Sequence, residues 1–155
     1  MKSLVIASIL IVGLFSCKNS AEPPKLKWIT IEEAVKIANG NNKKKFLVDV
    51  YTDWCGWCKV MDQKTFTDPE LIKYLNENFY AVKFNAEQKE PIMFKGTQFD
   101  WQPSKRGGVN SLAVALLNGR LSYPSLVYLN ANLDPIVVSP GYKEPARLLT
   151  ELQSL

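Results

Sequence analysis

The fold of this chain is decided by the stretch Trp54-Cys55-Gly56-Trp57-Cys58-Lys59, which follows a nearly continuous apolar run, Phe46–Tyr51. Such a run is typical of a strand buried on both faces, and this one carries a single carboxylate, Asp49. A helix is expected to run from Cys55 into the mid-sixties. The two cysteines of the stretch therefore lie where a buried strand gives way to the first turn of a helix.

This placement predicts a reactive pair of thiols. Cysteines three positions apart can close a small disulfide ring, and a helix N-terminus supplies unpaired N–H groups and positive potential that favour a thiolate. We predict that Cys55 is the exposed attacking sulfur with a lowered pKa and that Cys58 is the buried resolving thiol. Cys58 must lose a proton when it attacks. Asp49 is the candidate base, with a pKa raised by burial.

Two other interpretations of the pair are a structural zinc half-site and an inert structural disulfide. Zinc would need a further pair of cysteine or histidine ligands, but the chain has no histidine and its third cysteine, Cys17, stands alone. The lack of histidine also excludes catalytic triads and imidazole proton shuttles. Neither a metal nor another cofactor is expected.

Local patterns predict a mixed sheet flanked by helices. A capping box, Thr30-x-x-Glu33, predicts a first short helix that ends by Gly40. Further helices are expected from Cys55, after Asp68-Pro69, over Val109–Leu117 and from Pro145, and strands over Phe46–Tyr51, Phe79–Phe84, Ser125–Leu129 and Ile136–Ser139. With 155 residues, 46% of them hydrophobic, the chain can form one core.

The N-terminus resembles an export signal. A basic start, the apolar run Leu4–Leu14 and the ending Leu14-Phe15-Ser16-Cys17 are similar to the signal peptide and lipobox of bacterial lipoproteins. The run is too short for a spanning helix of about 20 apolar residues. We expect residues 1–16 to be the signal peptide, 17–27 a tether lipidated on Cys17, and 28–155 the folded domain. An uncleaved hydrophobic helix and an unmodified cysteine are the alternatives.

From about Lys45 to the C-terminus the sequence resembles the thioredoxin superfamily, and within it domains related to the C-terminal periplasmic domain of the electron carrier DsbD. The supporting residues are Asp49 six positions before Cys55, the Trp54-Cys55-x-x-Cys58-Lys59 core, Thr65-Phe66-x-Asp68-Pro69, Tyr123-Pro124 and Gly141. The resemblance implies an α/β, thioredoxin-like fold with a central mixed sheet flanked by helices. It also implies a cis Tyr123-Pro124 bond that faces the cysteines and offers backbone groups to a substrate; a trans proline that opens a strand is the alternative.

Two features depart from the family pattern. Gly56-Trp57 between the cysteines leaves the redox potential open, and Trp57 either contacts substrate or packs over the disulfide. With Trp54, Tyr123 and Pro124 these two residues form the predicted substrate-binding set. The segment 86–108 is longer than in the smallest thioredoxins. A hairpin is expected over Pro91–Trp101, with its aromatic side chains covering its own base or facing a partner, and Lys105–Gly108 is expected to be a solvated loop.

Together these observations predict a thiol-disulfide oxidoreductase of the protein-disulfide reductase type. It would be anchored through lipid on Cys17 at the periplasmic side of a bacterial membrane, act on protein thiols and disulfides, and be recharged by a membrane electron donor of DsbD type. A disulfide oxidase or isomerase, and a binding module with a structural disulfide, are the alternatives. The net charge of +4 is spread out, with one short run at Lys43–Lys45, and does not support nucleic-acid binding.

Overall fold

The computed structural model describes residues 24–40, 43–104 and 107–155. Cys17, the predicted lipidation site, and residues 1–16, the predicted signal peptide, lie outside these residues. A mixed sheet of five strands has the order β1-β3-β2-β8-β9. These strands are β1 (Trp28–Ile29), β2 (Lys45–Tyr51), β3 (Phe79–Asn85), β8 (Ser125–Leu129) and β9 (Pro135–Pro140). β1, β2 and β3 are parallel, whereas β8 runs antiparallel to β2 and β9 antiparallel to β8.

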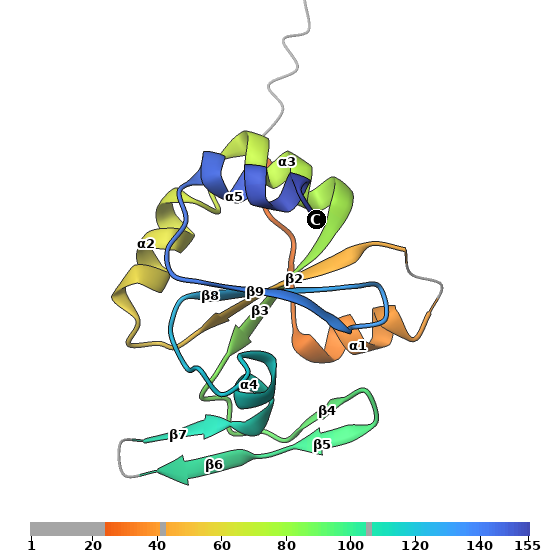
Figure 1. Cartoon of the computed structure of the whole chain (residues 1–155), viewed down its shortest axis with the longest axis vertical. Coiled ribbons are helices and arrows are strands. Elements are labelled where there is room, and N and C mark those ends of the chain that lie inside the picture. Colours follow the sequence, from red (N-terminus) through yellow and green to blue (C-terminus); the bar gives the residue numbers. More distant parts are fainter. Residues whose placement is uncertain (1–23, 41–42, 105–106) are drawn as a thin grey trace, which may run out of the picture.

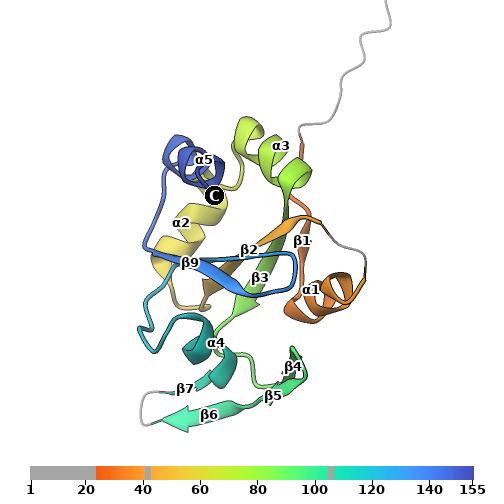
Figure 2. The same cartoon turned by 45° about the vertical axis from the view of Figure 1, so that its right-hand side comes forward.

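Helices cover both faces of the sheet (Figures 1 and 2). On one side lie α2 (Gly56–Lys64), α3 (Pro69–Asn78) and α5 (Pro145–Gln153), and on the other α1 (Ile31–Ala38) and α4 (Ser111–Leu116). The predicted capping box of α1 is present: the Thr30 side chain accepts from the Glu33 N–H, and the Glu33 carboxylate accepts from the Thr30 N–H. The expected thioredoxin-like fold is confirmed.

The alternation of side chains along β2 divides the core in two. Phe46, Val48 and Val50 pack with α1 and α4, while Leu47 packs with α2, α3 and α5. Asp49 is two positions after Leu47, so its side chain lies on the same face of the sheet. Its carboxylate therefore enters the layer between the sheet and α2. The position of Asp49 in β2 therefore places its carboxylate on the side of the sheet where the cysteines lie.

Two hairpins occupy the segment between β3 and α4. The first, β4 (Ile92–Phe94) with β5 (Thr97–Phe99), confirms the hairpin predicted around the turn at Gly96. Ile92 and Phe94 are buried in the core beside α1, and Phe99 packs against it. The prediction that aromatic side chains cover the base of this hairpin is confirmed for Phe94 and Phe99.

The second hairpin, β6 (Trp101–Ser104) with β7 (Gly107–Asn110), corrects two predictions. Gly107 and Gly108 belong to a strand and not to a loop; Lys105 and Arg106 lie outside the described residues. Val109 is also in β7, and α4 begins only at Ser111, because the Asn110 side chain accepts from the Leu112 N–H and caps the helix there. The short strand β1, which the sequence did not indicate, pairs with β3 at the sheet edge.

Candidate active site

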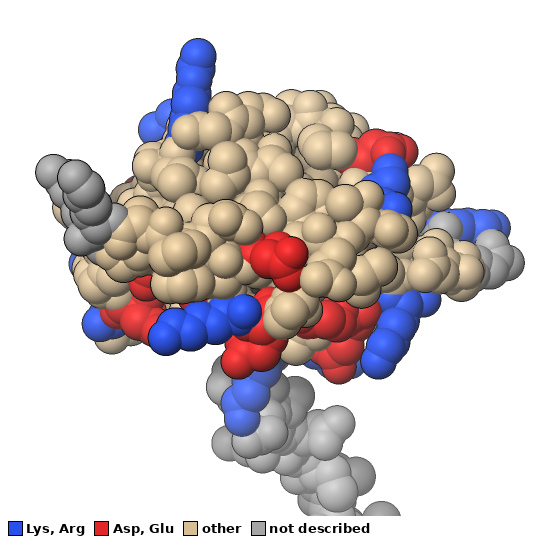
Figure 3. All heavy atoms as spheres, turned by 90° about the horizontal axis from the view of Figure 1, so that it is seen from below, with Lys and Arg blue, Asp and Glu red and all other residues tan. Residues whose placement is uncertain are grey.

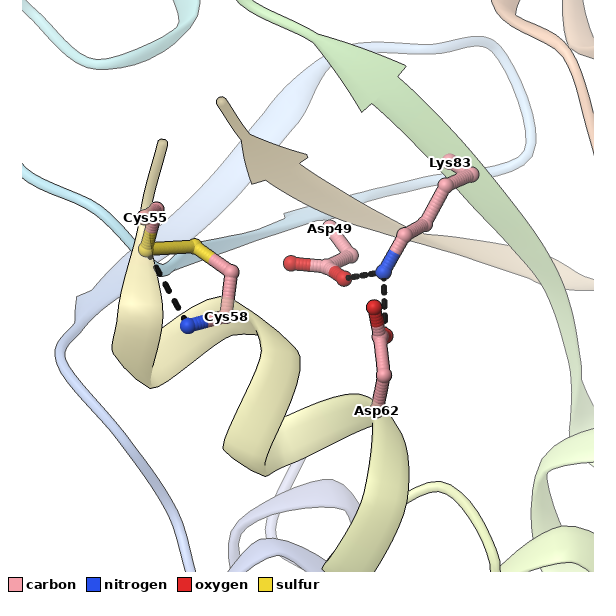
Figure 4. Close-up of polar contacts among 5 residues, drawn as sticks. All are labelled: Asp49, Cys55, Cys58, Asp62 and Lys83. Atoms are coloured by element: carbon pink, nitrogen blue, oxygen red, sulfur yellow. Dashed lines mark hydrogen bonds and ion pairs between the residues drawn. A yellow bond between two sulfur atoms is a disulfide. The ribbon is translucent and has the colours of Figure 1, made fainter. Parts of the chain in front are cut away.

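The disulfide lies at the start of α2, directly after β2. Cys55 is the N-cap of the helix: its N–H donates to the Thr52 carbonyl at 3.1 Å, and its sulfur accepts from the Cys58 N–H at 3.1 Å. Cys55 and Cys58 are joined by an S–S bond of 2.07 Å, with their Cα atoms 5.3 Å apart. The predicted pairing is thus present, and the attacking sulfur occupies the position that a helix N-terminus stabilises as an anion (Figure 4).

The prediction that Cys55 is exposed is wrong for the disulfide form. Cys55 is 5% exposed and Cys58 is 2% exposed, so both residues are buried. The Cys55 sulfur lies at the first turn of α2, where it is bonded to Cys58 and also caps the helix.

Asp49 lies behind the disulfide and is 1% exposed. One carboxylate oxygen, Oδ2, accepts from the Lys83 ammonium at 2.6 Å, and the other, Oδ1, has no hydrogen-bond partner among the described residues. Figure 4 shows that this second oxygen is on the side of the disulfide. Burial raises the pKa of the Asp49 carboxyl, and Lys83 opposes that rise without cancelling it. The predicted direction of the shift is confirmed.

Sequence reasoning missed Lys83 and Asp62. Lys83 is the register partner of Asp49 on β3, and its ammonium also contacts the Asp62 carboxylate on α2. Burial lowers the pKa of Lys83, but the two carboxylates outweigh burial and hold it above its ordinary value. The one signal in the sequence was a charged residue inside the apolar run Phe79–Phe84. The three side chains form a carboxylate–ammonium–carboxylate group that runs from the buried Asp49 beside the disulfide to the partly exposed Asp62.

Three aromatic rings lie around the Lys83 ammonium. Its Nζ lies 4.9 Å from the ring centre of Tyr51, 5.0 Å from that of Trp28 and 5.7 Å from that of Phe66. Such rings attract a cation through their faces. They therefore hold Lys83 charged next to Asp49.

The outer side of the disulfide carries two exposed tryptophans. Trp54 is 67% exposed and meets the Tyr123 ring edge-on at 5.9 Å, and Trp57 is 62% exposed and meets the Tyr142 ring at 5.4 Å. Gly56 between the cysteines is also exposed, and a Cβ there would meet no atom within 4 Å. More than half of each tryptophan is thus accessible to another molecule.

A groove of about 260 Å³ opens beside the cysteines, and we call it the cis-proline groove. It is lined by Trp57, Tyr123, Pro124, Gly141 and Tyr142. The Tyr123-Pro124 bond is cis, as expected, and the Pro124 carbonyl accepts from the Gly141 N–H at 2.8 Å. Gly141 has a φ of +86°, which favours glycine there. The predicted substrate-binding residues other than Trp54 and Gly56 line this groove.

A buried lysine that the sequence did not single out holds the wall of the groove. The Lys143 ammonium donates to the Pro140 carbonyl at 2.7 Å and to the Gly141 carbonyl at 3.3 Å. The Lys143 carbonyl accepts from the Thr65 hydroxyl at 2.6 Å, and burial lowers the pKa of the ammonium. Lys143 therefore ties the loop that carries Gly141 and Tyr142 to the end of α2.

Within residues 24–40, 43–104 and 107–155, no group of three or more histidine, cysteine, aspartate or glutamate side chains is placed to hold a metal ion. No helix in that part of the chain is long and apolar enough to span a membrane.

The chain is similar in sequence to several known proteins. A family profile described as "Thioredoxin-like domain" matches residues 31–155. Human spermatogenesis-associated protein 20 is 29% identical over 106 residues, which are 68% of this chain and 12% of that protein. The thiol:disulfide interchange protein DsbD of Campylobacter jejuni is 27% identical over 100 residues, 57% of this chain and 18% of DsbD. The chain thus spans less than a fifth of the length of these curated relatives.

Solved structures agree on the fold. A thioredoxin from Thermus thermophilus has a TM-score of 0.61 at 19% identity, covering 84% of this chain and 86% of that one. A protein described as a putative disulphide-isomerase from Bacteroides thetaiotaomicron has a TM-score of 0.58 at 22% identity, with coverages of 86% and 94%. At these identities the likeness shows the fold alone.

Proposed function

The chain belongs to the thioredoxin-like domain family, and on that premise we propose that it is a lipid-anchored, extracytoplasmic thiol-disulfide oxidoreductase that reduces disulfides of other proteins. The observation that carries the proposal is the Cys55–Cys58 disulfide at a helix N-terminus, with an oxygen of the buried Asp49 behind it that has no hydrogen-bond partner among the described residues. An inert disulfide needs no such carboxylate, and burial of an acid costs stability, so a functional role explains its place better.

Reduction of a client proceeds in two exchanges. The Cys55 thiolate attacks one client sulfur, which forms a mixed disulfide and releases the other client sulfur as a thiolate. Cys58 then gives its proton to Asp49 and attacks the Cys55 sulfur, which releases the second client thiolate. Both client thiolates take up protons, two electrons have moved to the client, and the Cys55–Cys58 disulfide has formed. A dithiol donor must reduce that disulfide before the next cycle.

The reductive direction is supported by the similarity to DsbD over part of the chain. We propose that a membrane electron carrier of DsbD type supplies the electrons, that Cys17 carries the lipid, and that residues 17–27 link the lipid to the domain. Of this link the structure describes only the end, where the Asn76 side chain donates to the Lys25 carbonyl and accepts from the Lys27 N–H. The domain would then work close to the membrane surface.

The direct test uses the chain from Lys18 onward, reduced beforehand and freed of reductant. It is mixed with insulin, as a protein disulfide, and with a small aromatic disulfide. Each reduced wild-type chain is expected to reduce one disulfide of either substrate. The Cys55→Ser variant is expected to reduce neither substrate. A Cys58→Ser variant should stop at the mixed disulfide and accumulate it. Equal activity of the Cys55→Ser variant, or a wild type that stays oxidised in excess dithiothreitol, would support the binding-module alternative and overturn the proposal.

A further inference from the structure

A second groove, of about 460 Å³, opens next to the active-site turn, and we call it the hairpin groove. Its lining residues are Asp53, Asn85, Glu87, Lys89, Trp101, Gly107 and Gly108. Trp54 links it to the cis-proline groove: its ring meets Tyr123, and its indole N–H donates to the Glu87 carboxylate at 2.9 Å. A polypeptide bound across the disulfide can therefore reach both grooves, one on each side of Trp54.

The far wall of the hairpin groove is the second hairpin, β6–β7. Along this hairpin the Trp101 ring lies against Gly108, where a Cβ would be 2.0 Å from a ring atom. The base of the hairpin is fastened to the near wall, because the Asn110 N–H donates to the Ala86 carbonyl at 2.7 Å and the Asn110 side chain donates to the Gln88 carbonyl at 3.2 Å. The two walls are thus held at a fixed spacing.

Core packing does not explain this hairpin. The first hairpin buries Ile92 and Phe94 in the core, whereas among the described residues of β6 and β7 only Asn110 is buried. The underside of the molecule, to which both hairpins contribute, is largely uncharged, and its charged side chains gather mainly along one border (Figure 3). The second hairpin therefore contributes a surface more than it contributes stability.

The lining of the hairpin groove suits a peptide. Gly107 is exposed and has no side chain, so an extended chain can approach the backbone of β7 there. Asp53 and Glu87 accept hydrogen bonds from Asn85 and Trp54, but neither carboxylate has an ion-pair partner among the described residues. Among the described lining residues, Lys89 is the one cation, and it lies over the Trp101 ring at 5.7 Å. The two carboxylates outnumber this ammonium among those residues, which favours a basic ligand.

We propose that the hairpin groove binds the extended segment that flanks the reacting cysteine of a client, and that Asp53 and Glu87 select a basic side chain in that segment. The proposal rests on the function proposed above, since it names the clients of the same disulfide. The groove should therefore bind a client segment with lysine beside the cysteine more tightly than one with glutamate there. This preference should weaken as salt screens the charges.

The test uses the full chain in detergent micelles, isotope-labelled at its four tryptophans. Ten-residue peptides with serine in place of cysteine, flanked by lysines or by glutamates, are titrated while the indole N–H signals are followed by NMR; a Trp101→Phe variant identifies the Trp101 signal. The lysine peptide is expected to shift that signal and to bind about fivefold more tightly than the glutamate peptide, since exposed charge pairs contribute little each. The Asp53→Asn variant should reduce the logarithm of the ratio of the two affinities by about half, since one of the two carboxylates is lost.

The control variant is Asp100→Asn, which loses the same charge between β5 and β6, outside the described lining of the groove, and should keep the full preference. Shifts confined to the Trp54 and Trp57 signals, equal binding of the two peptides, or an equal loss of preference in Asp100→Asn would each overturn the proposal. Because the peptides are redox-inert, the result does not depend on turnover. Reduction of the small aromatic disulfide, measured on the same wild-type sample, tests the proposed function separately.

Discussion

The two sides of the Cys55–Cys58 disulfide differ in burial and in charge. The inner side holds the Lys83 ammonium, which contacts the carboxylates of Asp49 and Asp62 and lies among aromatic rings. The outer side is aromatic and open to solvent, with Trp54 and Trp57. We infer that the inner side sets the rate of proton transfer and the outer side sets which clients are bound. Changes on the two sides should therefore affect different kinetic constants.

The largest effect is expected for Asp49→Asn. An amide cannot accept the Cys58 proton, so resolution of the mixed disulfide should slow by about 10²-fold at neutral pH. Stopped-flow measurement of client release from a preformed mixed disulfide isolates this step. Asp134→Asn, an exposed acid paired with Lys95, is the matched control and should keep the wild-type rate. A normal rate for Asp49→Asn would show that solvent accepts the proton and would remove the chemical role of the inner side.

The next effect concerns pH. Asp49 is a base only when ionised, so the rate falls as pH drops through its raised pKa. Lys83→Met removes the ammonium that opposes this rise, so the acidic limb of the pH–rate profile should move to higher pH by about one unit or more. Lys59→Met, an exposed lysine of α2, should leave the limb in place. A shift toward lower pH in Lys83→Met would contradict the assigned direction.

On the outer side, Trp57→Ala should raise the KM for insulin about tenfold and leave the rate with a small disulfide unchanged, because a large aromatic contact is lost only with a large client. Met93→Ala, which truncates an exposed apolar side chain of β4, is the matched control. If both disulfides are slowed to the same extent, Trp57 acts on the cysteines and not on clients, and the division between the two sides fails.

The smallest effect is on stability. A carboxyl whose pKa is higher in the folded protein than in the unfolded chain destabilises the fold when it is ionised. This cost is absent at low pH, grows as pH rises from about 4, the unfolded value, to the raised folded value, and is constant above it. Asp49→Asn should therefore unfold at a higher temperature than wild type at pH 7 and at the same temperature near pH 3. Calorimetry at the two pH values measures the difference.

The sequence predicts best what depends on local pattern. The strand Phe46–Tyr51, the helix capped at Thr30 and the hairpin around Gly96 all have local signals, and all three are present. Asp49 could be assigned as the base for the same reason, since it is the one charge in an apolar strand beside the cysteines.

The sequence does not show features that depend on how strands pair or on tertiary contacts. Lys83 is 34 positions from Asp49 and meets it only because β2 and β3 pair with these residues side by side. The second hairpin was hidden because Pro103, Gly107 and Gly108 are loop formers by local preference, and the Trp101 ring over Gly108 is a tertiary contact. The burial of Cys55 depends on the tertiary packing around the active-site turn, which position on a helix does not reveal.

The central claim, that the disulfide is a working redox centre of a reductase, is tested most directly by its midpoint potential. The chain from Lys18 onward is equilibrated in dithiothreitol buffers of graded ratio, and the fraction of free thiol is measured by alkylation. A midpoint near that of thioredoxin, about −270 mV, is the expected result. A value near about −120 mV would identify an oxidant instead, and a disulfide that stays closed well below about −300 mV would identify a structural bond and contradict the proposed function.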